Sequence, residues 1–239
     1  MDIYKIEDLG QLLAHNPYPG RGIVVGKSAD GRHAAVAYFI MGRSENSRNR
    51  VFEATEDGIR TRAWDESKVT DPSLIIYHPV RRLDDTLIVT NGDQTDTIRD
   101  GLLAGKTFGQ ALKVRRFEPD GPNWTPRISA ILTLAGGDFD YHMSILKSAD
   151  AEGSACSRFT FAYEALPGLG HFLHTYVTDG DPIPTFQGEP ERVAVGDDGE
   201  AFTDMIWSGL NADNKISLYP NWIDLATGRE EVRIINKHQ

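Results

Sequence analysis

Residues 41–50 hold a cluster of hydrogen-bond donors in a chain whose formal net charge is -10. The cluster combines guanidinium, hydroxyl and amide side chains, namely Arg43, Ser44, Asn46, Arg48 and Arg50. A guanidinium suits phosphate because its planar fork donates two parallel, charge-assisted hydrogen bonds. The cluster therefore indicates either a pocket for an anion or a solvated turn after a strand.

A second polar segment, residues 117–128, reads Phe-Glu-Pro-Asp-Gly-Pro-Asn-Trp-Thr-Pro-Arg-Ile. Its three prolines restrict the backbone to a few conformations. A pre-organised loop that carries acidic, amide, hydroxyl and basic side chains is typical of binding sites. The alternative is a rigid surface connection.

A third segment, residues 89–96, could hold an anion at a helix start, or be a simple turn with an N-cap.

We expect strands to position the cluster at residues 41–50, here called the arginine cluster. Apolar runs at 22–26 and 33–41 flank Asp30-Gly31, a dipeptide typical of hairpin turns. A second hairpin is predicted around Asp57-Gly58. The strands predicted there and beyond are 51–55, 59–64, 74–77 and 86–90. Arg81-Arg82 is interpreted as a solvated turn.

Apolar residues recur at helical spacing between Thr95 and Leu112, and Thr95 or Asp96 could cap the first turn. After Arg127, apolar residues again recur at every second position. This pattern predicts strands within 139–145, 159–163, 170–178 and 230–236. A second helix is predicted over 198–210 from its apolar stripe. With no linker or repeat, we expect one α+β domain of layered architecture over residues 1–239.

The composition narrows the class of protein. A balance of 25 Lys and Arg against 35 Asp and Glu argues against nucleic-acid binding, which needs a basic face. No stretch approaches the roughly twenty apolar residues of a membrane span, and the N-terminus lacks a secretory signal, so no membrane partner is expected. The single Cys156 leaves no internal disulfide or cysteine-rich zinc site. A cytoplasmic location is therefore expected.

Together these segments resemble the archaeal-type inosine monophosphate (IMP) cyclohydrolase family. The resemblance is carried by Gly-Arg-Gly-Ile-Val-Val-Gly at 20–26, the cluster at 41–50, Asn91-Gly92 with Thr95-Asp96, and Glu118 followed by Asn-Trp-Thr-Pro-Arg-Ile at 123–128. Weaker support comes from residues 162–170. The resemblance implies a four-layered αββα sandwich like that of the N-terminal nucleophile hydrolases. Those enzymes use a processed N-terminal Cys, Ser or Thr. This chain begins Met-Asp-Ile, so no such nucleophile is expected.

The implied activity closes the purine ring of 5-formamidoimidazole-4-carboxamide ribonucleotide (FAICAR), giving IMP and water in the last step of de novo purine biosynthesis. The carboxamide nitrogen attacks the formyl carbon. The site must therefore orient the formyl group, protonate its oxygen and accept the amide proton. Such a reaction needs no cofactor or metal in principle, and none is expected.

The resemblance also implies roles for single residues. Glu118 would orient the carboxamide and accept its proton. Arg43 would stabilise charge on the formyl oxygen or bind phosphate, and Tyr77 would either protonate the developing alkoxide or be a plain sheet tyrosine. The residues expected to bind the nucleotide are Ser44, Asn46, Arg50, Asn91, Asn123, Thr125 and Arg127.

Two other functions remain compatible with the sequence. One is a hydrolase of an amide or formamide on a nucleotide-like substrate, with water activated by Glu118. The other is a non-catalytic purine nucleotide-binding module. A homo-oligomer is compatible with the resemblance, and residues 180–198 could be a lid, a subunit contact or a plain loop.

Overall fold

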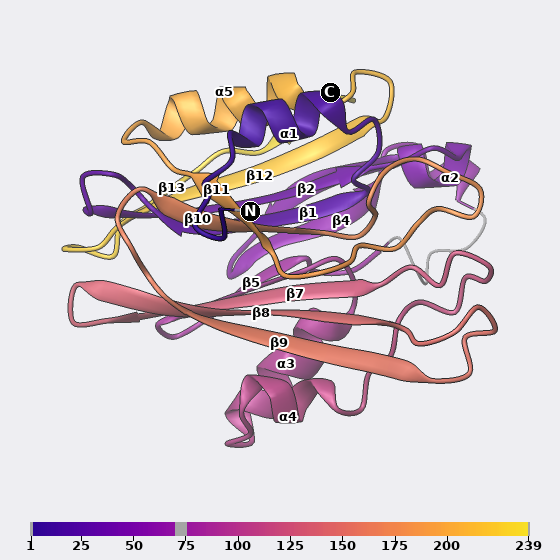
Figure 1. Cartoon of the computed structure of the whole chain (residues 1–239), viewed down its shortest axis with the longest axis horizontal. Helices are drawn as coiled ribbons and strands as arrows, with labels where there is room; N and C mark the ends of the chain where they lie inside the picture. Colours follow the sequence, from indigo (N-terminus) through magenta and orange to yellow (C-terminus); the bar gives the residue numbers. More distant parts are fainter. Residues whose placement is uncertain (1, 70–75, 239) are drawn as a thin grey trace.

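Two antiparallel sheets stack face to face at the centre of the molecule, and each has seven strands among the described residues. The computed structural model describes residues 2–69 and 76–238. Helices lie on the outer face of each sheet, so the layers run helix, sheet, sheet, helix (Figure 1). The protein therefore belongs to the α+β class, as the sequence predicts.

The first sheet has the order β11-β10-β1-β2-β12-β13, and β14 also pairs with β12. Its strands are β1 (Arg21–Lys27), β2 (His33–Met41), β10 (Leu169–His174), β11 (Glu191–Ala194), β12 (Lys215–Asp224), β13 (Glu230–Val232) and β14 (Ile235–Asn236). The predicted β1–β2 hairpin is present, and its Gly31 has a φ of 74°, which glycine adopts without strain. Because β2 ends at Met41, the hairpin leads directly into the arginine cluster.

The second sheet is a meander in chain order from β3 to β9. Its strands are β3 (Arg50–Thr55), β4 (Gly58–Ala63), β5 (Val80–Leu83), β6 (Thr86–Thr90), β7 (Arg127–Ala135), β8 (Asp138–Ser148) and β9 (Cys156–Glu164). The predicted hairpin around Asp57-Gly58 joins β3 and β4.

The described residues form five α-helices. They are α1 (Leu9–His15), α2 (Glu45–Arg48), α3 (Gln94–Leu103), α4 (Phe108–Leu112) and α5 (Gly199–Gly209), with a 3₁₀ turn at Glu66–Lys68. In Figure 1, α1 and α5 lie over the first sheet and α3 and α4 over the second. The helix predicted over 198–210 is α5, and Asp198 is its N-cap, since its carboxylate accepts from the amides of residues 200 and 201. Within the described ranges, no helix is long and apolar enough to cross a membrane.

Alternate residues of the central strands pack into different cores. Ile23 and Val25 of β1 face the second sheet, whereas Val24 faces the layer of α1 and α5. A third core forms where Ile98 of α3 and Phe108 of α4 pack against β6, β7 and β8. Both faces of β1 and β2 are buried, which explains why these strands read as continuous apolar runs.

The predicted helical block at 95–112 is two helices. Gly105, with a φ of 73°, ends α3, because a glycine in the left-handed region terminates a helix at little cost. Thr107 then caps α4. The predicted N-cap was wrong: Asp93 occupies the N-cap position of α3, and Thr95 and Asp96 lie inside the helix.

Several strand predictions need correction. Arg81 and Arg82 lie in β5 and not in a turn, and Arg81 forms ion pairs of 2.9 Å with Asp57 and 2.7 Å with Asp96. The predicted strand at 170–178 ends at residue 174, and the tail at 230–236 forms two short strands. Of the strand predicted near 74–77, residues 74 and 75 lie outside the described residues, and residues 76 and 77 belong to no strand.

Candidate functional site

A cavity of about 300 Å³, here called the site pocket, lies between the arginine cluster and residues 117–128, here called the proline-rich loop. The residues that line it are Tyr18, Arg21, Arg43, Ser44, Ser47, Arg50, Glu118, Asp120, Asn123, Thr125, Tyr176 and Ile183. The fold thus brings together the two polar segments that the sequence singles out. Arg43, Ser44, Arg50, Glu118, Asn123 and Thr125 are the predicted site residues among them.

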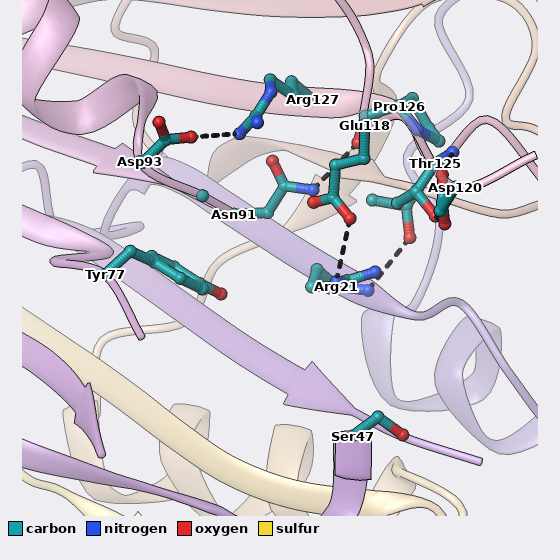
Figure 2. Close-up of polar contacts among 12 residues, drawn as sticks. Arg21, Ser47, Tyr77, Asn91, Asp93, Glu118, Asp120, Thr125, Pro126 and Arg127 are labelled. Atoms are coloured by element: carbon teal, nitrogen blue, oxygen red, sulfur yellow. Dashed lines mark hydrogen bonds and ion pairs between the residues drawn. The ribbon is translucent and has the colours of Figure 1, made fainter. Parts of the chain in front are cut away.

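Glu118 supplies a buried carboxylate to the pocket, with an exposed fraction of only 3%. Its backbone N–H donates to the carbonyl of Thr125 at 2.8 Å, which fixes the start of the loop. Its Oε2 lies 3.6 Å from Nη2 of Arg21, and Figure 2 shows the two side chains pointing toward one another. Burial raises the pKa of Glu118 above its ordinary value, while the charges of Arg21 and Arg127 oppose the rise. Glu118 is therefore a stronger base than an exposed glutamate.

Two guanidinium groups in the pocket keep unused N–H donors. Arg50 is 1% exposed; its Nε donates to the carbonyl of Ser47 at 2.8 Å, but its buried Nη1 has no hydrogen-bond partner in the described chain. The buried Nε of Arg21 likewise has no such partner there. A buried donor without an acceptor is costly, so these groups indicate a place for an anionic or oxygen-rich ligand.

Arg43 stands at the edge of the pocket, where 37% of its side chain is exposed. Its Nη1 donates to Asp179 at 2.5 Å and to the carbonyl of Gly180 at 2.8 Å, and its guanidinium lies 5.3 Å from the ring centre of Tyr18. The hydroxyls of Ser44 and Ser47 cap the first turn of α2 beside it. This part of the cluster is an accessible rim, and Arg50 lies behind it.

Hydrogen bonds hold the proline-rich loop in place. Thr125 donates its hydroxyl proton to the carboxylate of Asp120, and its backbone N–H donates to the same carboxylate at 2.7 Å. The hydroxyls of Thr125 and Tyr176 lie 2.5 Å apart, so the proton between them comes from Tyr176. Asn123 accepts the backbone N–H of Ile183 at 3.0 Å. The loop is thereby tied to residues 176–183, and part of the 180–198 segment lines the pocket.

Three predicted binding residues lie outside the pocket lining. Asn91 is fully buried and its amide holds the backbone, donating to the carbonyl of Pro126 and accepting from the N–H of Ile128, both at 2.9 Å (Figure 2). Arg127 points to the α3 side, with an ion pair of 2.8 Å to Asp93. Asn46 lies in α2, and its buried Oδ1 has no hydrogen-bond partner among the described residues.

Tyr77 lies deeper than the pocket lining. Its hydroxyl is 2.9 Å from that of Tyr38, and both side chains are buried. Burial raises the pKa of Tyr38, and the neighbouring Tyr77 adds to the rise. The hydroxyl of Tyr77 points to the same space as Arg21 and Glu118 (Figure 2). A phenol pair therefore lies beside the buried ion pair.

Some lining residues were missed by reasoning from the sequence. Arg21 is the most important, and the glycines on either side of it were its only signal, because they mark close backbone packing. A Cβ on Gly22 would lie 2.3 Å from the ring of Phe39, so this position needs glycine. The other missed lining residues are Tyr18, Ser47, Asp120, Tyr176 and Ile183.

Comparisons with known proteins agree with this geometry. A family model described as IMP cyclohydrolase-like protein matches residues 18–227. An IMP cyclohydrolase of Methanopyrus kandleri is 31% identical over 184 residues, which cover 71% of this chain and 89% of that relative. The IMP cyclohydrolase of Methanocaldococcus jannaschii is 33% identical over 117 residues, 48% of this chain and 56% of that relative.

The family match covers most of the chain and includes every residue that lines the site pocket. The chain belongs to the IMP cyclohydrolase-like protein family.

Proposed function

We propose that this protein is an IMP cyclohydrolase and that it closes the purine ring of FAICAR in the site pocket. The observation that carries the proposal is the buried Glu118 carboxylate beside the guanidinium groups of Arg21 and Arg50, which line an anion-sized cavity and each keep an unpaired N–H donor. A monophosphate nucleotide supplies the oxygens that such donors require.

The nucleotide phosphate is placed toward the arginine cluster. Arg50 donates its free Nη1 from behind, and Arg43 donates from the exposed rim. The hydroxyl of Ser44 and the amide of Asn46 supply further contacts there. Of the two roles open to Arg43, this position favours phosphate binding, because a charge at the rim is the first that an incoming anion meets.

The reacting groups are placed at Glu118 and Arg21. Glu118 holds the carboxamide and accepts its proton while the nitrogen forms a bond to the formyl carbon. Arg21 donates to the formyl oxygen, which carries the developing negative charge. Protonation of that oxygen gives a carbinolamine. Its hydroxyl group then leaves as water while the formamido nitrogen loses its proton, and the ring becomes aromatic. Proton transfers of this kind typically contribute about 10² to 10⁴ in rate.

Tyr77 is the proposed proton donor for the formyl oxygen. When Tyr38 donates to the hydroxyl of Tyr77, the proton of Tyr77 is free to point toward the substrate.

Other residues bind the nucleotide or support the site. Asn123 and Thr125 contact the nucleotide from the proline-rich loop. Arg127 and Asn91 do not contact the nucleotide. The charge of Arg127 stabilises the Glu118 carboxylate, and Asn91 holds the backbone of the loop at Pro126.

We infer that the whole chain forms one enzyme domain. The helix–sheet–sheet–helix order supports an N-terminal nucleophile hydrolase-like sandwich, and the proposed chemistry needs no covalent nucleophile. A central core drawn from residues 23 to 225 supports one domain over residues 1–239. A cytoplasmic location fits the free Cys156 and a nucleotide substrate.

The test is incubation of the pure protein with FAICAR, followed by purine absorbance and chromatography of the products. We expect IMP to accumulate in proportion to enzyme. Release of formate with the deformylated amine would instead support the hydrolase. Binding without any product would support a non-catalytic module, and either result would contradict the proposal.

A further inference from the structure

One edge of the second sheet is open among the described residues. β9 pairs with β8 along its whole length and with no other strand within residues 2–69 and 76–238. Other edges are covered: Glu7 exchanges backbone hydrogen bonds with β11, and the amide of Asn236 bonds both backbone groups of Phe52 in β3. The outer strands β13 and β14 are short, with three and two residues. β9 is therefore the long free edge, nine residues in length.

Apart from the charged Arg158 and Glu164, β9 lacks the features that normally protect an edge strand. Its sequence, Cys-Ser-Arg-Phe-Thr-Phe-Ala-Tyr-Glu, has no proline and no lysine, and its register with β8 is unbroken. Three aromatic residues alternate along one face, Phe159, Phe161 and Tyr163, and Phe159 is 44% exposed. Such a strand is well suited to pair with another strand.

The sequence of β9 is complementary to itself. In an antiparallel pair of two copies centred on Phe161, Arg158 lies opposite Glu164 of the other copy, and Phe159 lies opposite Tyr163. Opposite charges and aromatic pairs both stabilise directly opposed positions. The guanidinium of Arg158 is fixed beside the strand by the carbonyls of Lys113 and Arg115. Glu164 forms no ion pair within the described chain, so its charge is available.

We propose that β9 pairs with β9 of a second copy of this chain, antiparallel and centred on Phe161, so that two seven-stranded sheets join across a two-fold axis. A two-fold axis is the commonest symmetry of homo-oligomers and uses the same surface on both copies. No residue that lines the site pocket belongs to β9, so the inference does not rest on the proposed activity.

The first test measures mass by analytical ultracentrifugation of the full chain and of three charge variants. The wild type should be a dimer. Glu164→Arg places like charges opposite each other twice and should raise the dimer dissociation constant by roughly tenfold or more. Arg158→Glu should do the same, and the double variant Arg158→Glu/Glu164→Arg should restore the dimer. Circular dichroism checks that each variant is folded.

The second test fixes the register and avoids any charge change. Thr160 and Ala162 lie opposite each other across the proposed axis. In a Cys156→Ser background, Thr160→Cys and Ala162→Cys proteins should form a disulfide when mixed and oxidised. Neither should do so alone, because equivalent positions are then too far apart for disulfide geometry. A wild type that stays monomeric, or a dimer that is unaffected by Glu164→Arg and gives no mixed cross-link, would overturn the proposal.

Discussion

At the residue scale, burial distinguishes the arginines of the cluster more than their spacing does. Arg50 is buried with a donor unfilled, whereas the exposed Arg48 donates to the carbonyl of Gly42 and to Asn214, both at 3.0 Å. Arg43 sits between these cases at the rim. The sequence shows three arginines within ten residues, and only the fold shows which of them keeps an unpaired donor.

Replacing Arg50 should therefore weaken nucleotide binding selectively. A charge-assisted hydrogen bond contributes about 1.5 to 3 kcal/mol, so Arg50→Met should raise the Kd of IMP by roughly tenfold to a hundredfold. Arg48→Met is the matched control and should leave the Kd unchanged. Isothermal titration calorimetry measures both, and equal effects of the two substitutions would remove Arg50 from the phosphate site.

The protonation of Glu118 predicts a pH dependence. Because burial raises its pKa, the carboxylate form should be lost at a higher pH than for an exposed glutamate, and kcat/KM should fall on the acid side. The charge of Arg21 lowers the pKa of Glu118, so Arg21→Met should move this acid limb to higher pH. Ionisation of the substrate is the same for both proteins. An acid limb that stays in place would show that Glu118 does not control it.

The same raised pKa has a consequence for stability. The folded state binds the proton of Glu118 more tightly than the unfolded chain does. This group therefore makes folding less favourable as pH rises from the unfolded pKa of Glu through the higher folded value. We expect the stability difference between the wild type and Glu118→Gln to change in that direction over this window, measured by urea unfolding. A difference that is independent of pH would contradict the raised pKa.

At the element scale, the proline-rich loop is held by the chain of Asp120, Thr125 and Tyr176. Thr125→Val keeps the side-chain volume, but the buried hydroxyl of Tyr176 loses its acceptor and the carboxylate of Asp120 loses one of its two hydrogen bonds from Thr125, at a cost of about 1 to 3 kcal/mol. We expect a lower Tm and a lower kcat, because the carbonyl of Thr125 accepts from Glu118 in the same loop. Thr133→Val in β7 is the control, since its hydroxyl makes one longer contact of 3.3 Å with Thr86. Equal losses of kcat in both variants would contradict this role.

β12 shows why part of the fold escapes prediction from sequence. Its central Pro220 argues against a strand inside a sheet, and no element was predicted there. In the structure the carbonyl of Pro220 accepts from the N–H of Arg233, so its nitrogen faces the same side. That side lies opposite the gap between β13 and β14, where no ladder bond is needed from residue 220. The proline is tolerated because the neighbouring strands β13 and β14 are interrupted opposite it.

At the whole-molecule scale, local patterns account for most strands, for α5 and for the two polar segments. They do not account for how the pocket closes. Tyr176 and Ile183 come from the segment after β10, and their place beside Asn123 and Thr125 depends on the stacking of the two sheets. The ion pair between Arg21 and Glu118 likewise joins residues that are nearly a hundred positions apart in the sequence. Long-range packing of this kind leaves no local signal.

In the proposed mechanism, the carboxylate of Glu118 accepts a proton as the purine ring closes. The single-turnover rate of IMP formation from FAICAR, compared between the wild type and Glu118→Gln, measures this role. We predict a rate at least about tenfold lower in the variant, since a general base typically contributes about 10² to 10⁴ in rate, with the affinity for IMP unchanged. An equal rate in the two proteins would contradict the account.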